Sequence, residues 1–471
     1  MASNATVAPI TPEQQEELDQ VFERARKALA IIETYDQATV DRLCQAVAWA
    51  GGNEATAVRL ANMSVDETGM GSREPTRRSK VLAILRDALR QKSMGIIEEL
   101  PELGIVKYAK PAGVIASLIP VTSPYVTPVG IAIYAIKCKD AVVFSPHPGS
   151  KKTTNEVVRM MRAALEAAGA PADLVQCVER PSIPLANLLM SSCDLTIATG
   201  GPAMVKAAYS SGKPAYGVGA GNATMVIDET ADIVEAARNS RISKTNDHGS
   251  GCSADGNLLV DAKVYDGILE RLVAEGGYVV AGAEKALLHK AYWDADGVRT
   301  ADTIARPAAQ VAAKAGFALP ADKTFLIVEE TEIGRHNRFS SEKLGIVLAM
   351  FKFHGFDDAL VKVQQIFAVG GKGHSCGIYS FNDEHIHRLA LVAPVSRMMV
   401  RQVQSRSNAG TFTNGMPMTS SMGCGIWGGN ITNENIALKH YMNVTWVSRP
   451  IPEDKPSEAE LFGEFYNTQV F

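Results

Sequence analysis

The sequence predicts an α/β protein whose sheets are mostly parallel and doubly wound. Short apolar segments, such as residues 140–148, alternate with segments that carry apolar residues at helical spacing, such as residues 151–169. Glycine turns join them, as at Gly200 and Gly201 after the apolar run "DLTIAT". This alternation favours strands connected by crossover helices over an all-helical or all-β fold.

The length of the chain and the rhythm of its segments predict two α/β domains. A chain of 471 residues is long enough for two or three domains. Strand and helix patterns fill residues 104–229, and the same rhythm returns in residues 256–353. We expect the first domain to comprise residues 1–235 and the second to comprise residues 236–428. Residues 429–471 are expected to return to the first domain.

One uncharged stretch, residues 111–136, has the length of a membrane-spanning helix. Pro120, Pro124 and Pro128 interrupt it, and prolines in these positions break a helix. We therefore expect a strand, a turn and the start of a buried helix here. The N-terminal residues lack the basic start and the apolar core of a signal peptide.

The composition argues against several classes of partner. The chain is 46% hydrophobic and 21% charged, and its formal net charge is −4 with acids and bases well mixed. This balance is typical of a globular protein that binds neither nucleic acid nor an anionic membrane. The seven cysteines are scattered and form no Cys-x-x-Cys pair, which indicates reduced thiols and a cytoplasmic location.

Cys252 stands apart from the other cysteines because it lies in a polar, glycine-rich loop, "TNDHGSGCSADGN". A structural cysteine usually behaves as a small buried hydrophobe. Here Gly249, Gly251 and Gly256 allow the backbone to approach a ligand closely, and the polar surroundings permit a thiolate. The loop is therefore a candidate for nucleophilic chemistry.

Seven motifs occur in the order seen in CoA-acylating aldehyde dehydrogenases, and over residues 13–447 the chain resembles that family. They are "GVIASLIPVTSPYVTP", "VVFSPHPGSKKTT", "IATGGPAMVKAAYSSGKPAYGVGAGN", the Cys252 loop, "EKLGIVLAM", "GGKGHS" and "GCGIWGGN". The resemblance implies the aldehyde dehydrogenase fold. This has a Rossmann-type dinucleotide-binding domain, an α/β catalytic domain and a small oligomerisation arm. It also implies oxidation of an aldehyde to an acyl-CoA, with NAD or NADP as hydride acceptor and coenzyme A as co-substrate.

Cys252 matches the nucleophile of that family, which forms a thioester with the substrate. The oxyanion that forms on the way needs hydrogen-bond donors. Many relatives carry an asparagine in the turn that reads Thr122-Ser123-Pro124 here. Since the asparagine is absent, Thr122, Ser123 or a backbone group must donate.

The choice between hydrolysis and acyl transfer depends on a general base for water. Hydrolytic relatives use a glutamate, and our alignment puts Val218 in its place. Water needs a strong base far more than a thiol does, so the loss of the glutamate fits transfer to coenzyme A. His374 in "GGKGHS" matches a family histidine that accepts this proton or positions coenzyme A. His385 and His387 lack a third ligand in the sequence, so no metal site is expected.

The resemblance also assigns the cofactor contacts. The adenosine ribose falls in the strand-turn-helix "VVFSPHPGSKK", and Thr199-Gly200-Gly201 lets the pyrophosphate approach backbone N–H groups. An acid that binds the ribose in NAD-preferring relatives is absent, and lysines follow, which favours NADP. The cofactor-binding residues expected are Ser145, His147, Lys151, Thr199, Gly200, Gly201, Gly219 and Glu342.

Arg406 is the candidate for substrate recognition. It lies in "RQVQSRSNAGTFTNG", which matches the segment that lines the aldehyde pocket of relatives, at a place where those acting on small aldehydes carry proline. A guanidinium suits a sulfonate or carboxylate, and the chain resembles family members that act on sulfoacetaldehyde. Alternatively, Arg406 is exposed or binds a phosphate of coenzyme A. Succinate semialdehyde and acetaldehyde are the alternative substrates. The alternative to an enzyme is a non-catalytic scaffold that retains the fold.

Two strand-like segments match the arm through which members of the family associate. They are "GIVKYAK", within residues 103–112, and the C-terminal "NVTWVSR". The resemblance therefore implies a homodimer or homotetramer.

Overall fold

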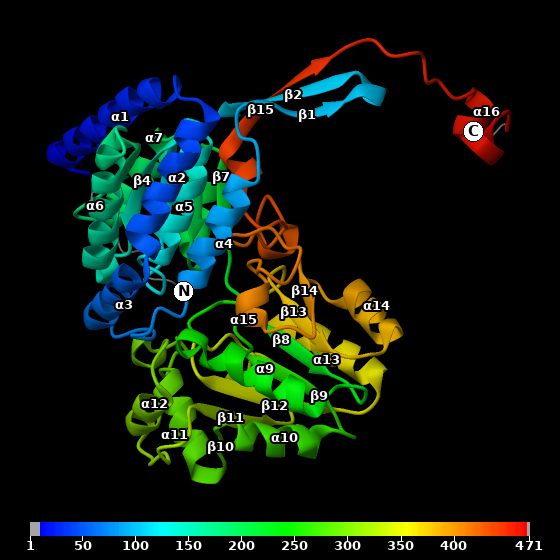
Figure 1. Ribbon diagram of the computed structural model, residues 1–471. Helices are drawn as coiled ribbons and strands as arrows, with labels where there is room; N and C mark the ends of the chain where they lie inside the picture. The colour runs from blue at the N-terminus through cyan, green and yellow to red at the C-terminus, as the bar shows by residue number, and fades with distance from the viewer. Residues whose placement is uncertain (1–9, 469–471) are drawn as a thin grey trace.

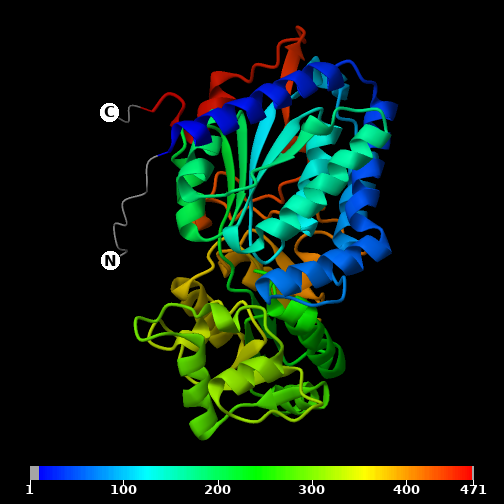
Figure 2. The same cartoon turned by 90° about the vertical axis from the view of Figure 1, so that its left-hand side faces the viewer.

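The computed structural model describes residues 10–468 as two α/β domains and a projecting three-stranded arm (Figure 1). Both domains are built on parallel sheets with helices packed on their faces, as the sequence predicts. In Figure 2 the N-terminal domain lies above the second domain, and its helices cover the sheet from both sides. The predicted fold class is confirmed.

The sheet of the N-terminal domain has five parallel strands in the order β5-β4-β3-β6-β7. Their bounds are β3 (Val114–Ile119), β4 (Ala141–Pro146), β5 (Val175–Cys177), β6 (Leu195–Thr199) and β7 (Ala215–Val218). The chain runs outward from β3 to β5 and then returns to place β6 on the other side of β3. The order therefore reverses between β3 and β6.

Eight helices surround this sheet. They are α1 (Pro12–Ile32), α2 (Gln37–Gly52), α3 (Glu54–Thr68), α4 (Arg78–Leu89), α5 (Val126–Lys137), α6 (Lys151–Ala167), α7 (Ile183–Ser192) and α8 (Pro202–Tyr209). Helix α5 packs against β3 and β4, and α6 packs against β4 and β5, with α2 behind both, while α1 and α7 contact the sheet as well. Helix α1 begins with the capping box expected at Thr11, whose side chain accepts from the backbone N–H of Gln14.

The uncharged stretch of residues 111–136 forms β3, a turn and most of α5, as predicted. All twelve residues of α5 are buried, because the helix lies between the sheet and the outer helices α2 and α4. A helix that is apolar on every side is suited to that position. Within residues 10–468, none of the helices has both the length and the apolar character needed to span a membrane.

The second domain has a seven-stranded parallel sheet in the order β10-β11-β12-β9-β8-β13-β14. Its strands are β8 (Thr224–Ile227), β9 (Asn257–Asp261), β10 (Gly277–Val279), β11 (Phe325–Glu330), β12 (Val347–Phe353), β13 (Cys376–Tyr379) and β14 (Met398–Val400). Its helices are α9 (Ile233–Thr245), α10 (Tyr265–Ala274), α11 (Gly282–Tyr292), α12 (Ala308–Ala315), α13 (Phe356–Val369), α14 (Asp383–Val392) and α15 (Gln404–Ser407).

The change of domain comes earlier than the boundary that we placed at residue 235. Strand β8 already pairs with β9 and β13 of the second sheet, so the chain crosses between Val218 and Thr224. Residue 235 lies inside α9. The sequence of β8 is apolar like that of β7, and hydrophobic pattern alone does not distinguish which of two parallel sheets a strand joins.

The C-terminal segment returns to the N-terminal domain, because Ile436, Leu438 and Tyr441 belong to its hydrophobic core. The chain then forms β15 (Met442–Ser448), which pairs antiparallel with β2 (Ile105–Pro111). Strand β1 (Gly95–Leu100) completes the arm on the other edge of β2. Beyond the arm the chain extends to α16 (Glu458–Phe462), away from both domains (Figure 1).

Strand β1 is absent from our sequence prediction. Its sequence, "GIIEEL", places two isoleucines side by side and two glutamates side by side. The alternation that identifies a half-buried strand is therefore missing. The arm projects from the body, so β1 buries little on either face and needs no alternation.

Gly373 offers a test of how the loop before β13 is held. Its φ is +84°, and a Cβ there would lie 1.8 Å from the carbonyl oxygen of Cys424. We expect Gly373→Ala to lower the free energy of unfolding by more than about 1 kcal/mol, measured by thermal or urea denaturation. Gly370→Ala is the control, since a Cβ at Gly370 meets nothing within 4 Å. Equal stability of the two variants would contradict this account.

Candidate active site

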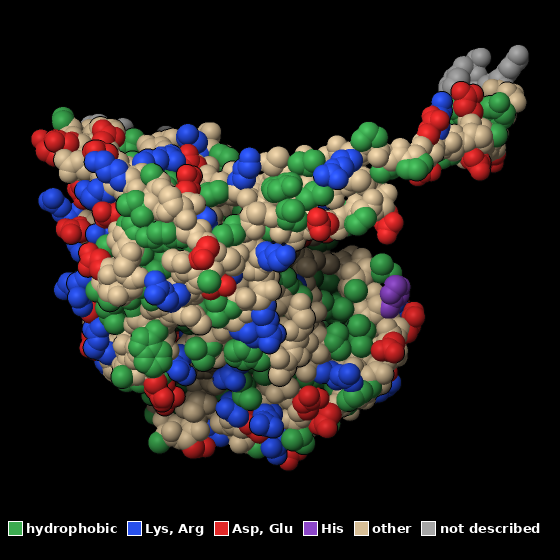
Figure 3. Space-filling model, turned by 45° about the horizontal axis from the view of Figure 1, so that its top comes forward, with side chains coloured by type: hydrophobic (Ala, Val, Ile, Leu, Met, Phe, Trp, Pro, Cys, Tyr) green, Lys and Arg blue, Asp and Glu red, His purple; other side chains and the backbone are tan. Residues whose placement is uncertain are grey.

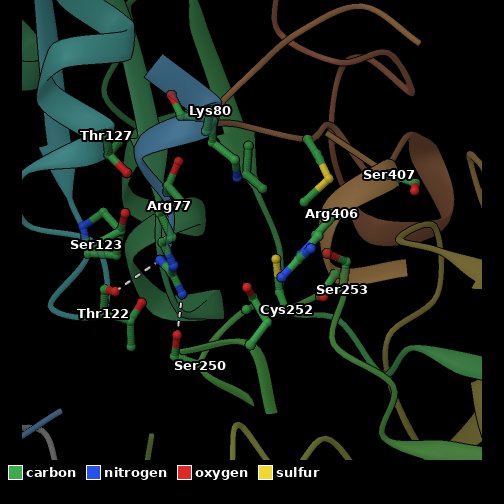
Figure 4. Close-up of a pocket in the computed structure, with 18 of the residues that line it drawn as sticks. Arg77, Lys80, Thr122, Ser123, Thr127, Ser250, Cys252, Ser253, Arg406 and Ser407 are labelled. Atoms are coloured by element: carbon green, nitrogen blue, oxygen red, sulfur yellow. Dashed lines mark hydrogen bonds between the residues drawn. The ribbon is translucent and has the colours of Figure 1, made fainter. Parts of the chain in front are cut away.

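A cavity of about 790 Å³ lies between the two domains, with walls from both. The N-terminal domain contributes the loops that follow β3, β4, β6 and β7 and the start of α4. The second domain contributes the Cys252 loop and the segment around α15 (Figure 4). Ligands of open α/β sheets bind beyond the carboxyl ends of the strands, where the strand order reverses. The loops after β3 and β6 meet this description.

Most of the residues selected from the sequence line this cavity. They are Thr122, Ser123, His147, Thr199, Gly200, Gly201, Gly219, Cys252, Glu342 and Arg406. His374 lies behind Cys252 and is fully buried. Ser145 and Lys151 are not brought to the cavity. Ser145 is enclosed within the end of β4, and Lys151 is exposed at the start of α6.

Cys252 and His374 form the central contact of the site. The Sγ of Cys252 lies 3.0 Å from Nε2 of His374, and Nδ1 of His374 lies 2.9 Å from Oγ of Ser375. Burial, with Arg397 nearby, lowers the pKa of His374 to about 3, so the imidazole is neutral. With Nδ1–H donating to Ser375, Nε2 is free to accept the thiol proton.

The thiol of Cys252 is protonated in this arrangement. Burial raises its pKa to about 12, and Glu342 and Cys424 act in the same direction. Lys80 and Arg77 oppose the shift. The sequence suggested a partly polar environment that permits a thiolate, whereas the folded loop holds a neutral thiol hydrogen-bonded to a neutral imidazole. A nucleophilic attack from this state must therefore transfer the proton as the new bond forms.

The glycines around Cys252 permit close backbone packing. A Cβ at Gly221 would lie 2.0 Å from the carbonyl oxygen of Cys252, so the "GVGAGN" loop lies directly against the cysteine. Gly249 has φ +70°, and a Cβ there would lie 2.4 Å from the carbonyl oxygen of Gly345. Both positions therefore require glycine, which explains part of the glycine content of the "GVGAGN" loop and of the Cys252 loop.

Arg77 was missed by the sequence analysis, and it ties the two walls of the cavity together. One guanidinium nitrogen donates to the carbonyl oxygen of Thr122 over 3.1 Å. The other donates to Oγ of Ser250 and lies 2.8 Å from a carboxylate oxygen of Asp247. Asp247 has φ +51°, and its carboxylate also accepts from the backbone N–H of Ser72. The turn before α5 and the Cys252 loop are thus held to one guanidinium.

Thr122 and Ser123 lie across the cavity from Cys252 in Figure 4. The carbonyl oxygen of Thr122 is engaged by Arg77, and the backbone N–H of Ser123 donates to Pro120 over 3.2 Å. Both side-chain hydroxyls therefore remain as the donors that this turn offers to the cavity.

Val218, at the end of β7, also lines the cavity. Its side chain is 2% exposed and belongs to the core of the N-terminal domain. An apolar side chain at this position has no group that accepts a proton from water.

Glu342 reaches the cavity from the loop before β12. Its Oε1 accepts from the backbone N–H of Gly221 over 2.9 Å. Burial raises the pKa of Glu342 to about 7, against the Gly221 hydrogen bond and the cations Arg299 and Lys244. The carboxylate therefore fixes the "GVGAGN" loop while its other oxygen remains available.

A second carboxylate lies near the expected ribose position. Both oxygens of Glu67, on α3, accept hydrogen bonds at the start of α6, from the backbone N–H groups of Lys152 and Thr153 over 2.8 Å. The acid expected from the sequence would lie just after β4. This one comes from a helix more than eighty residues earlier in the chain, at separations of 85 and 86 residues.

His385 lies on α14, and His385, Asp228 and Glu229 offer ligand atoms within 4.8 Å of one another. The Asp228 carboxylate is already bonded. Its Oδ1 accepts from Thr230, and its Oδ2 accepts from Ser380 and lies 2.8 Å from Nδ1 of His385. The ring of His385 also stacks on Phe356 at 3.9 Å. These contacts give the group a structural role that joins β8 to α14.

The fold and the cavity define a two-domain α/β enzyme class with a half-buried cysteine at the ligand site. A sequence model described as "Aldehyde dehydrogenase family" matches residues 2–286. The chain belongs to the aldehyde dehydrogenase family. The family resemblance inferred from the seven motifs is confirmed.

The chain is similar to two relatives and one solved structure whose names are more specific than the family. The chain is 41% identical to "Sulfoacetaldehyde dehydrogenase" from Acholeplasma sp, over 94% of this chain and 93% of the relative. It is 39% identical to "Sulfoacetaldehyde dehydrogenase (acylating)" from Bilophila wadsworthia, over 94% of this chain and 97% of the relative. An acetylating aldehyde dehydrogenase from Geobacillus thermoglucosidasius superposes with a TM-score of 0.90 at 34% identity, covering 94% of this chain and 99% of that one.

The neutral state of Cys252 leads to a prediction for its alkylation. Because the pKa of the thiol is about 12, we expect the rate of iodoacetamide labelling to rise about tenfold per pH unit from pH 7 to pH 9.5 without a plateau. Peptide mass spectrometry would locate the label, and Cys252→Ala is the control. A plateau below pH 8 would mean that the free enzyme holds a thiolate.

Proposed function

We propose that this enzyme oxidises sulfoacetaldehyde to sulfoacetyl-CoA, with a nicotinamide dinucleotide as hydride acceptor. The observation that carries the proposal is the contact between Cys252 Sγ and His374 Nε2 at a cavity lined by Val218, which our alignment puts in the place of the base for water. Relatives named for this substrate, at 41% and 39% identity over most of the chain, support it.

The chemistry begins at Cys252. Its sulfur attacks the aldehyde carbon while the thiol proton passes to Nε2 of His374, 3.0 Å away. The carbonyl π electrons move to oxygen, where Ser123 or Thr122 donates a hydrogen bond. A nicotinamide dinucleotide bound here would supply the acceptor for the hydride of the former aldehyde carbon, and loss of that hydride leaves a thioester on Cys252.

The second half of the reaction transfers the acyl group to a thiol. Before coenzyme A reacts, His374 releases to solvent the proton that it took from Cys252. The sulfur of coenzyme A then attacks the thioester carbon while its thiol proton passes to Nε2 of His374, and the Cys252 sulfur leaves and recovers that proton. His374 is the group within reach of both proton transfers. A thiol ionises far more easily than water, so a buried imidazole suffices where a hydrolytic enzyme needs a carboxylate.

The residues at the strand ends fit a dinucleotide. Gly201 precedes α8 without a side-chain cap. Pro202 has no N–H and the Met204 N–H donates to the Gly201 carbonyl, so among the described residues the Ala203 N–H is the group of the first turn that is open to a pyrophosphate. A Cβ at Gly201 would meet nothing within 4 Å, which leaves room for a ligand to approach. Glu342 is the group that would accept from the nicotinamide ribose.

The expected preference for NADP rests on the lysines that follow β4. Lys151 is exposed and outside the cavity, and the Glu67 carboxylate occupies the first N–H groups of α6. A carboxylate repels the 2′-phosphate of NADP, whereas Lys151 attracts it. We therefore propose a nicotinamide dinucleotide as cofactor, and the activity assay compares NAD and NADP directly.

We further propose that the enzyme is a homo-oligomer that associates through the arm. In Figure 3 the arm and the chain beyond it project from the body with hydrophobic side chains on their surface. Val444, Trp446 and Val447 of β15 are 38%, 59% and 39% exposed. Strand β15 pairs with β2 along one edge only, so its other edge is available to a second copy.

A cytoplasmic location fits the cysteines. All seven are free thiols in the structure, and they are buried or half-buried. Unpaired cysteines are typical of a reducing compartment.

The first assay is the formation of NADH or NADPH at 340 nm with sulfoacetaldehyde, succinate semialdehyde and acetaldehyde, each with and without coenzyme A. We expect activity to depend on coenzyme A and kcat/KM to be highest for sulfoacetaldehyde. His374→Ala should lower kcat by about 10²- to 10⁴-fold through the lost proton acceptor, and Cys252→Ala should abolish turnover. Equal rates without coenzyme A would mean that water is the acceptor.

The oligomer is tested by light scattering. Trp446→Glu places a charge on the exposed face of β15, and we expect it to shift the protein towards monomer. Trp49→Glu is the matched control, because Trp49 is 71% exposed on α2, away from the arm. If both variants have the same mass as the parent protein, the arm is not the interface.

A further inference from the structure

The lining of the cavity carries an excess of positive charge. Its cationic side chains are Arg77, Lys80, Arg401 and Arg406, and Glu342 is the one carboxylate among the described lining residues. Two of these cations have evident partners. Arg77 is paired with Asp247 at 2.8 Å, and Arg401 lies 4.1 Å from the centre of the Phe381 ring. Lys80 and Arg406 remain.

Lys80 lies on the first turn of α4 and faces the interior of the cavity. In Figure 4 its side chain descends from α4 towards the space around Cys252. Within residues 10–468, its ammonium makes neither an ion pair nor a hydrogen bond, unlike Arg77 three residues earlier. A desolvated cation without a partner is costly, and such groups are typical of ligand sites.

The wall around Lys80 offers further donors for an anion. Four hydroxyl residues line the same cavity from α4 and the turn before it, from α5 and from the loop after α15. They are Thr76, Ser79, Thr127 and Ser420. Helix α5 also begins at Val126 without a side-chain cap, so the positive end of its dipole has no side-chain acceptor. A sulfonate has three acceptor oxygens and suits a cation surrounded by hydroxyl groups.

We propose that Lys80 binds the sulfonate of the substrate and so selects anionic aldehydes. This inference rests on the proposed function. In sulfoacetaldehyde the sulfur atom is only two bonds from the carbonyl carbon, so the cation that binds it must lie close to Cys252. Arg406 also lines the cavity, but its side chain is exposed, and it fits a phosphate of one of the larger ligands.

The electrostatics of the thiol agree with this assignment. Lys80 and Arg77 lower the pKa of Cys252 against its burial. Burial lowers the pKa of Lys80 to about 8, with Arg77 acting in the same direction and Cys252 and Asp247 opposing. A bound sulfonate would favour the charged ammonium and offset the cost of its burial.

The competing role for Lys80 is stabilisation of the Cys252 thiolate. That role acts on every aldehyde alike, whereas sulfonate binding acts on anionic aldehydes alone. The two are separated by comparing sulfoacetaldehyde with methylsulfonylacetaldehyde, a neutral sulfone of similar shape.

The experiment measures kcat/KM for both aldehydes in the parent enzyme and in Lys80→Met, Lys80→Arg and Lys92→Met. Losing one charge-assisted contact should lower kcat/KM of Lys80→Met for sulfoacetaldehyde by about 10- to 100-fold, chiefly through KM. The value for the neutral sulfone should change less than about threefold. Lys80→Arg should recover part of the loss, and Lys92→Met, an exposed lysine beyond α4, should behave as the parent enzyme.

A binding measurement is independent of turnover. Isethionate, an unreactive sulfonate of the same length, should slow the alkylation of Cys252 by iodoacetamide in the parent enzyme and not in Lys80→Met. Thermal denaturation of each variant shows whether it is folded. Should Lys80→Met prove unstable, Lys80→Gln replaces it.

The outcomes are distinguishable. An equal loss for both aldehydes in folded Lys80→Met, or protection by isethionate that survives the substitution, would overturn the role of Lys80. If the parent enzyme oxidises neutral aldehydes with coenzyme A but not sulfoacetaldehyde, the proposed substrate is wrong. Protection by isethionate that requires Lys80 would in that case still support an anion site there.

Discussion

The site depends on the ion pair between Arg77 and Asp247, because it joins loops from the two domains. Arg77 precedes α4 in the N-terminal domain, and Asp247 lies in the loop that carries Cys252. Both side chains are mostly buried, at 15% and 11% exposure, so removal of one partner would leave a desolvated charge, at a cost of about 3–5 kcal/mol. The same guanidinium engages Thr122 and Ser250. The distance across the cavity is thereby set by one side chain.

Burial shapes the reactivity of the cysteine. The environment that positions Cys252 against His374 also removes water from both, which raises the pKa of the thiol and lowers that of the imidazole. A neutral pair is stable without substrate and resists oxidation, since the thiolate is the reactive form. Charge develops only as the sulfur attacks. Preorganised donors and cations around the cavity then act where charge appears, in a medium of low dielectric constant.

The cavity is positively charged because of where its cations and the nearby carboxylates lie. Its positive groups come mainly from the start of α4 and the segment around α15, while acidic residues nearby are engaged in structural contacts, as Asp247 is with Arg77 and Glu67 is with α6. Arg77 and Lys80 lie three residues apart on one face of the chain, at the helical spacing that brings side chains together. That spacing in "TRRSK" is the one signal in the sequence that would have identified both.

The sequence by itself determined the α/β class, the buried helix α5, the "GVGAGN" and Cys252 loops and their family. Local pattern, proline position and motif order act within short segments and need no knowledge of distant contacts. Only the tertiary structure decided that β8 joins the second sheet, that Ser145 and Lys151 lie outside the cavity, and that Arg77, Lys80 and Glu67 belong to the site. Arg77 and Lys80 reach the cavity, and Glu67 reaches the start of α6, through packing between elements far apart in the chain. The charge state of Cys252 likewise depends on burial, which no single segment specifies.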